Sequence, residues 1–157
     1  MEFKTLNAEH DTALAALIRT NLKAHQLDIP GTVYFDEGLD HLSPYYDQEG
    51  RVYYVLMEED KLVGGIGLAE IGVFAECCEL QKLYLDDSVK GRGLGYRLID
   101  KIETAARSFG YKRMYLETHT NLQAAIHIYE KAGYREIARP DSVVHSTMNR
   151  FYVKELS

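Results

Sequence analysis

The chain has 157 residues, of which 46% are apolar and 11% aromatic, so we expect residues 1–157 to form a single globular domain. Its formal net charge of −6 argues against non-specific nucleic-acid binding, which needs a basic surface, and favours attraction of a cationic substrate. The sequence shows neither an apolar run near the ~20 residues that cross a bilayer nor the start of a secretory signal, so we expect a cytoplasmic protein without membrane association.

The first third of the chain predicts a short strand, a helix and an acidic loop. The strand lies near residues 3–6, and Asn7 can cap the helix that follows. The apolar face of this helix recurs every three or four residues, at Leu14, Leu17, Ile18 and Leu22. Residues 28–50 then combine six carboxylates with four aromatic side chains and almost no basic residue, which indicates a surface loop that contains a short helix.

The rest of the chain predicts an antiparallel meander and then alternating helices and strands. Strand-like runs lie at residues 52–57, 62–70 and 77–85, and the glycines inside the second run indicate a bulge or close packing. An amphipathic helix at 94–109, a strand at 113–118, a helix at 122–132 and strands at 134–138 and 148–156 follow. This order is typical of a mixed α+β fold with one strand-helix-strand crossover.

A glycine loop at residues 90–96 joins the third of these strands to the amphipathic helix. Free N–H groups at a helix start bind anions, and glycines let the backbone approach a phosphate closely. A flexible turn is the plain alternative for Gly91, Gly93 and Gly95. The loop lacks both the glycine spacing of a dinucleotide-binding fingerprint and the Gly-Lys-Ser/Thr end of a P-loop, so dinucleotide and nucleoside triphosphate sites are excluded.

Two motifs resemble the GNAT superfamily of acetyltransferases. Lys90-Gly91-Arg92-Gly93-Leu94-Gly95 is similar to the family's Gln/Arg-x-x-Gly-x-Gly/Ala, with Lys90 at the first position as the one departure. The segment from Ala125 to Tyr134 is similar to Ala-x-x-x-Tyr-x-x-x-Gly-Phe/Tyr. The resemblance extends over nearly the whole chain and implies one GNAT domain, a central mixed sheet of six to seven strands flanked by about four helices, and acetyl-CoA as cosubstrate.

The resemblance implies that the glycine loop grips the pyrophosphate of acetyl-CoA and that the pantetheine arm pairs with the preceding strand. A backbone N–H near residues 83–85 would polarise the thioester carbonyl. An Asn near the second helix also contacts the cofactor in the family, but Asn121 stands four residues before Ala125 instead of the usual three. The implied cofactor-binding residues are Leu83, Tyr84, Leu85, Lys90, Gly91, Arg92, Gly93, Leu94, Gly95, Tyr96 and Asn121.

Two side chains are implied to carry the chemistry. Tyr129 would be the general acid that protonates the departing thiolate, although a tyrosine at such a helical position more often packs in a core. Glu79, or an ordered water, would take a proton from the amine. Alternation along a strand predicts Glu79, Gln81, Leu83 and Leu85 on one face, unless a bulge changes the register.

The acceptor and the assembly stay open. In the family, the loop between the first helices commonly lies over the acceptor, so residues 28–50 would form one wall of a site for a cationic amine; charges that only keep this loop soluble are the alternative. The acceptor could be a protein N-terminus, a lysine, a polyamine, an amino acid or an aminoglycoside, and the chain could form a homodimer. A catalytically silent acyl-CoA-binding regulatory domain is the rival function.

The histidines and cysteines do not indicate a metal site. Neither the six histidines nor the adjacent Cys77 and Cys78 show metal-ligand spacing, and two adjacent cysteines cannot form a disulfide framework. We therefore expect no metal. Among the histidines, only His119 is a candidate for an alternative base, because it lies beside the strand at 113–118.

Overall fold

The computed structural model describes residues 1–144 and 146–156. In this part of the chain seven strands form one mixed sheet in the order β1-β2-β3-β4-β5-β7-β6. Only β4 and β5 pair in parallel, and every other neighbouring pair is antiparallel. The strands are β1 Glu2–Thr5, β2 Val52–Glu58, β3 Lys61–Glu70, β4 Cys77–Leu85, β5 Arg113–Thr118, β6 Arg135–Ile137 and β7 Arg150–Glu155.

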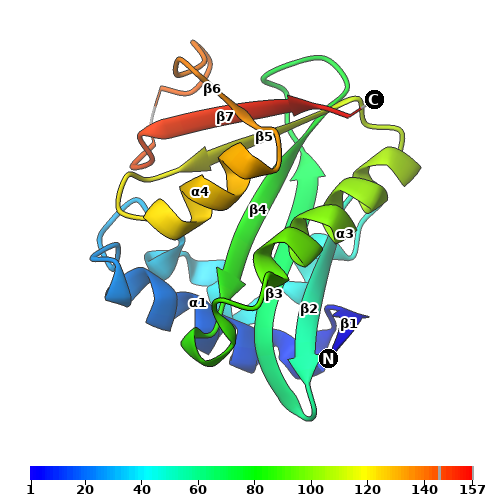
Figure 1. Cartoon of the computed structure of the whole chain (residues 1–157), viewed down its shortest axis with the longest axis vertical. Helices are drawn as coiled ribbons and strands as arrows, with labels where there is room; N and C mark the ends of the chain where they lie inside the picture. The colour runs from blue at the N-terminus through cyan, green and yellow to red at the C-terminus, as the bar shows by residue number, and fades with distance from the viewer. Residues whose placement is uncertain (145, 157) are drawn as a thin grey trace.

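Helices cover both faces of the sheet (Figure 1). They are α1 Asp11–Ala24, α2 Ser43–Tyr46, α3 Leu94–Ser108 and α4 Gln123–Lys131. Helices α3 and α4 pack on one face, in a core cluster with Leu56, Met114 and other strand residues. Helices α1 and α2 pack on the other face around Tyr53 and Val55. The expected mixed sheet of six to seven strands with about four helices is confirmed, and no helix among the described residues is long and apolar enough to cross a membrane.

The elements begin and end close to the residues expected from the sequence. Strands β4 and β5 have the predicted bounds. Asn7 caps a short 3₁₀ turn, Ala8–His10, because its side chain accepts a hydrogen bond from the Glu9 N–H over 2.8 Å, and this turn leads into α1. The acidic segment 28–50 holds two further 3₁₀ turns, Val33–Phe35 and Glu37–His41, before α2.

A β-bulge interrupts β4 at Lys82. Gly67 pairs with Gln81 and Gly65 with Tyr84, so two residues of β4 lie opposite Ile66 alone. Lys82 has a φ of +53°, a left-handed conformation that is uncommon for a residue with a side chain. The expected face alternation is therefore wrong beyond Gln81, because the extra residue turns Leu83 and Leu85 onto the α3 and α4 face.

Tyr53 on β2 holds this bulge in place. Its hydroxyl donates a hydrogen bond of 2.7 Å to the carbonyl oxygen of Lys82. The tyrosine ring lies over β3, where a Cβ added to Gly65 or Gly67 would come within 2.5 Å and 2.4 Å of ring atoms. The glycines of β3 thus mark close packing, as expected, and the ring that they admit fixes the backbone of the neighbouring strand.

Strands β4 and β5 diverge soon after they begin to pair. Their parallel register covers only three pairs, from Cys77 with Arg113 to Glu79 with Tyr115. Beyond Glu79, no strand in the described part of the chain pairs with this edge of β4, so its backbone N–H and C=O groups are available to an extended ligand.

Candidate active site

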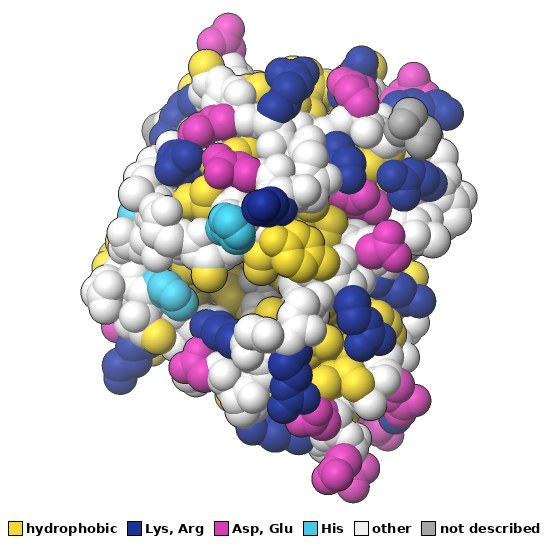
Figure 2. Space-filling view, viewed as in Figure 1, with side chains coloured by type: hydrophobic (Ala, Val, Ile, Leu, Met, Phe, Trp, Pro, Cys, Tyr) yellow, Lys and Arg dark blue, Asp and Glu magenta, His cyan; other side chains and the backbone are white. Residues whose placement is uncertain are grey.

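A cavity of about 730 Å³ opens where β4 and β5 diverge. Its walls come from β4, β5, the start of α3, helix α4, the end of α1 and the loop that follows α1. This volume is within the range of ligand-binding pockets. Figure 2 shows the same face hollowed near its centre, with hydrophobic side chains in the hollow and histidine and basic side chains near its rim.

The glycine loop forms one end of the cavity, and its three glycines have different structural roles. Gly91 and Gly93 have φ values of +82° and +73°, and a Cβ on either would meet no protein atom within 4 Å. Gly95 lies inside α3, where a Cβ would come within 2.6 Å of Ile128 on α4. The first two glycines therefore shape the turn before α3, and the third lets α3 and α4 pack closely.

The start of α3 faces the cavity. The N–H groups of the first helical turn have no intrahelical partner, so they can donate to an anion together with the positive end of the helix dipole. Lys90 lines the cavity and pairs with Asp87 over 2.8 Å. The Arg92 side chain lies outside the cavity lining and pairs with Glu58 on β2 over 2.7 Å.

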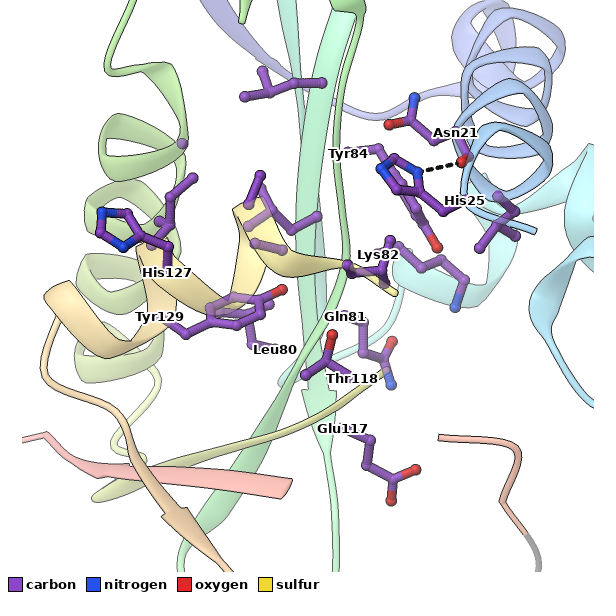
Figure 3. Close-up of a pocket in the computed structure, with 18 of the residues that line it drawn as sticks. Asn21, His25, Leu80, Gln81, Lys82, Tyr84, Glu117, Thr118, His127 and Tyr129 are labelled. Carbon is purple, nitrogen blue, oxygen red and sulfur yellow. Dashed lines mark hydrogen bonds between the residues drawn. The ribbon is translucent and has the colours of Figure 1, made fainter. Parts of the chain in front are cut away.

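Tyr129 lies on α4 and its hydroxyl points into the cavity (Figure 3). The residue as a whole is 6% exposed, and its ring packs in the core cluster beneath α3 and α4. No described residue shares a side-chain hydrogen bond with its hydroxyl, and no fully buried polar side-chain atom of the described residues lacks a partner. The hydroxyl therefore reaches the open cavity. Burial raises the pKa of Tyr129, so the phenol stays protonated at neutral pH.

Two carboxylates line the cavity. On β4, Glu79 accepts a hydrogen bond of 2.7 Å from the amide of Gln81, whose own oxygen accepts one of 2.6 Å from the Tyr46 hydroxyl. On β5, Glu117 accepts from the hydroxyls of Tyr115 and Ser146 over 2.8 Å and 3.0 Å. Burial raises the pKa of Glu79, and the nearby charge of Glu117 raises it further.

The structure brings most of the predicted site residues into one cavity. Of the thirteen predicted residues, Arg92 and Asn121 lie outside its lining. The Asn121 amide donates a hydrogen bond of 2.9 Å to the backbone oxygen of His25 at the end of α1. The ring of His119 accepts one from the Asn121 N–H over 3.0 Å, and His119 also lies outside the lining.

The acidic segment 28–50 reaches the cavity with Gly31, Thr32 and Val33 and not with its carboxylates. Asp40, for example, forms a two-bonded ion pair of 2.8 Å with Arg19 on α1. Three residues of this segment therefore line the cavity, but the carboxylates in the cavity lining are those of Glu79 and Glu117.

Sequence reasoning missed several residues that line the cavity. They are Asn21, His25, Lys82, Glu117, Thr118 and His127. Thr118 and Glu117 could have been found, because the end of a strand that diverges from its neighbour is a natural ligand site. Lys82 could not, because a bulge changes which side of β4 it faces. His145 lies outside the described residues.

Comparisons with known proteins agree with this geometry. A model of the acetyltransferase (GNAT) family matches residues 16–134. The chain is 36% identical over 136 residues to YjgM of Escherichia coli strain K12, an uncharacterised N-acetyltransferase, and the match covers 85% of this chain and 81% of YjgM.

Solved structures share the fold. A GNAT-family acetyltransferase of Staphylococcus aureus Mu50 has a TM-score of 0.86 at 23% identity, over 99% of each chain. The PaiA N-acetyltransferase of Thermoplasma acidophilum, solved with coenzyme A, has a TM-score of 0.74 at 18% identity, over 98% of each chain.

Proposed function

Because the chain belongs to the GNAT family of acetyltransferases, we propose that it transfers the acetyl group of acetyl-CoA directly to a primary amine. One observation carries the proposal: a single cavity joins an anion-binding helix start, an unpaired strand edge and a protonated tyrosine. These three features match the pyrophosphate, the pantetheine arm and the sulfur of the cosubstrate, in that order along its length.

Acetyl-CoA would bind along β4 with its pyrophosphate at the glycine loop. The open backbone at Gly91 and Gly93 leaves room for phosphate oxygens, and Lys90 adds a positive charge. Leu83, Tyr84 and Leu85 border the strand edge that would receive the pantetheine amides. Because the side chains of Arg92 and Asn121 lie outside the cavity, we assign a smaller part of the affinity to them.

We expect Gly93→Ala to weaken CoA binding by about tenfold or more, because a Cβ there would project into the open space beside the loop and force a left-handed alanine. Gly110→Ala is the matched control, since Gly110 also has a positive φ and an open Cβ position but lies outside the cavity. Calorimetric titration with CoA compares the two. Equal affinities in both folded variants would remove the loop from the binding site.

The transfer needs a base for the amine, a hydrogen-bond donor for the thioester oxygen and an acid for the departing sulfur. The amine nitrogen attacks the thioester carbon and loses a proton to Glu79 or to an ordered water beside it. A backbone N–H of residues 83–85 stabilises the carbonyl oxygen as charge develops on it. As the carbon–sulfur bond breaks, the Tyr129 hydroxyl donates its proton to the departing thiolate, which leaves as the CoA thiol. The acetyl group stays on the nitrogen of the acceptor, which is now an N-acetyl amide.

The pH dependence of kcat/KM tests Glu79. If the bound ammonium gives its proton to Glu79, the acidic limb of the parent profile lies at the pKa of this carboxyl, which burial raises. In Glu79→Gln only the free amine reacts, so the limb moves up to the pKa of the amine and activity returns in alkaline solution. The same limb in both proteins would assign the base to water.

The reaction itself is tested by thiol release with a panel of amines. Turnover predicts stoichiometric free CoA and acetylated amine, both dependent on acetyl-CoA. A catalytically silent acyl-CoA-binding domain would retain acetyl-CoA and release no CoA with any amine.

The amine would arrive as an ammonium ion, which the net charge of −6 and the two cavity carboxylates attract. We place the reaction in the cytoplasm, where the free, buried Cys77 and Cys78 stay reduced.

A further inference from the structure

Lys82 is the one lysine of β4, and its side chain lines the cavity. Its ammonium nitrogen lies 5.9 Å from the ring centre of Tyr45 and 5.8 Å from that of Tyr46, on the side of the sheet covered by α1 and α2. Figure 3 shows Lys82 on the opposite side of the cavity from Tyr129. The bulge that Tyr53 anchors thus directs a lysine side chain toward the end of the cavity that the cosubstrate would leave free.

This ammonium has no direct counter-ion among the described residues. No described carboxylate lies within ion-pair distance of it, and no described side-chain hydrogen bond uses it. Lys82 is half-buried, and a lysine largely removed from water is usually paired, because an unpaired charge there is costly. Burial lowers the pKa of Lys82, while the more distant charges of Glu79 and Asp36 oppose the shift. The ammonium of Lys82 can therefore pair with an anion that enters the cavity.

The same end of the cavity also carries the two carboxylates. Glu79 lies three residues before Lys82 on β4, and Glu117 lies on β5, where its oxygens are already held by the hydroxyls of Tyr115 and Ser146. The acceptor end therefore presents both signs of charge, with the negative groups on the strands that flank the reacting centre.

Resting on the proposed function, we propose that the acceptor is a small amine that carries its own carboxylate, such as an amino acid, and that Lys82 binds this carboxylate. The ammonium group of such a zwitterion then faces Glu79, and its carboxylate replaces the missing counter-ion of Lys82. A polyamine or an aminoglycoside offers only positive charges, which Lys82 repels. The side chain of a lysine within a protein also carries no carboxylate next to its amine, so it offers Lys82 no anion to bind.

A matched pair of acceptors tests the inference. We expect the parent protein to acetylate an α- or ω-amino acid with a kcat/KM about 10- to 100-fold above that of the same compound as its amide, since a charge-assisted contact is lost in the amide. Lys82→Met should lower kcat/KM for the acid and remove its preference over the amide, while the CoA affinity stays unchanged. The amide should lose nothing, because Lys82 only repels its ammonium group. Lys82→Arg should keep the preference for the acid. Met and Arg, like Lys, carry a Cβ, so neither substitution changes the backbone strain of the positive φ at position 82.

Two outcomes would overturn the inference. One is a parent enzyme that acetylates the amide, or a polyamine, as well as it does the acid. The other is an acid preference that survives Lys82→Met in a variant with unchanged thermal stability. Both leave acetyl transfer intact and so differ from a failure of the proposed function, in which no amine is turned over at all and both proposals fall.

Discussion

Tyr129→Phe should lower kcat between about 10-fold and 10⁴-fold while CoA affinity stays nearly unchanged. The substitution removes one hydroxyl that has no hydrogen-bond partner among the described residues and keeps the ring that packs in the core. A proton donor acts only as the thiolate leaves, so its loss affects the transition state and not the binding of the cosubstrate. Thiol-release kinetics and calorimetric titration with CoA measure the two effects separately.

Tyr54→Phe is the matched control for this variant. Tyr54 is a half-buried tyrosine that packs against the same core cluster as Tyr129, but it lies outside the cavity lining. We expect its kcat to stay within about twofold of the parent, because no group of the cavity is lost. A Tyr129→Phe variant with a near-normal kcat would show that this residue only packs in the core, and an ordered water would then be the acid.

The sequence was sufficient to predict the parts of the fold that depend on local pattern. Strands β4 and β5 follow from runs of strand-forming residues, and the start of α3 follows from glycines directly before an amphipathic repeat. The glycine loop and Tyr129 could be picked out as cavity residues because each belongs to a short motif whose spacing can be read directly from the sequence. Each of these features is set by residues within a few positions of one another.

The end of the cavity near Lys82 depends on contacts between residues that are distant in the sequence. Lys82 takes its direction from Tyr53, 29 residues earlier, through the hydrogen bond to its carbonyl oxygen. Tyr53 in turn fits only because Gly65 and Gly67 lack a Cβ. Strict alternation along β4 therefore fails beyond Gln81, and the lysine that the bulge directs into the cavity could not be identified from its position in the sequence.

Charge density in a segment was a poor guide for the same reason. Residues 28–50 contain six carboxylates, but Asp40, for example, forms an ion pair with Arg19. The segment lines the cavity only with Gly31, Thr32 and Val33. Two single carboxylates on different strands, Glu79 and Glu117, meet there because β4 and β5 pair at their starts and then diverge. Topology, and not local composition, brings these charges together.

A buried ionic cluster ties α3 to the C-terminal strands, away from the cavity. Glu103 on α3 is 4% exposed, and its carboxylate accepts a hydrogen bond of 2.9 Å from the Tyr134 hydroxyl. The ammonium of Lys154 on β7 lies 2.9 Å and 3.1 Å from the two oxygens and also donates to the carbonyl oxygen of Ala132 over 2.7 Å. Arg107 reaches the same carboxylate from the surface, at 3.6 Å.

Glu103→Ala should lower the free energy of unfolding by about 3 kcal/mol, because it leaves the ammonium of Lys154 and the hydroxyl of Tyr134 without their buried partner. Arg107→Ala removes only the exposed member of the cluster and should cost less than about 1 kcal/mol. Replacing Glu103 by Leu together with Lys154 by Met should recover much of the loss, since only the solvent-exposed charge of Arg107 then stays unpaired. Urea unfolding followed by circular dichroism measures all three variants. Equal losses of unfolding free energy in Glu103→Ala and Arg107→Ala would mean that solvent screens the whole cluster. A loss confined to Glu103→Ala, with recovery in the double variant, would assign the stability to the pair of Glu103 and Lys154.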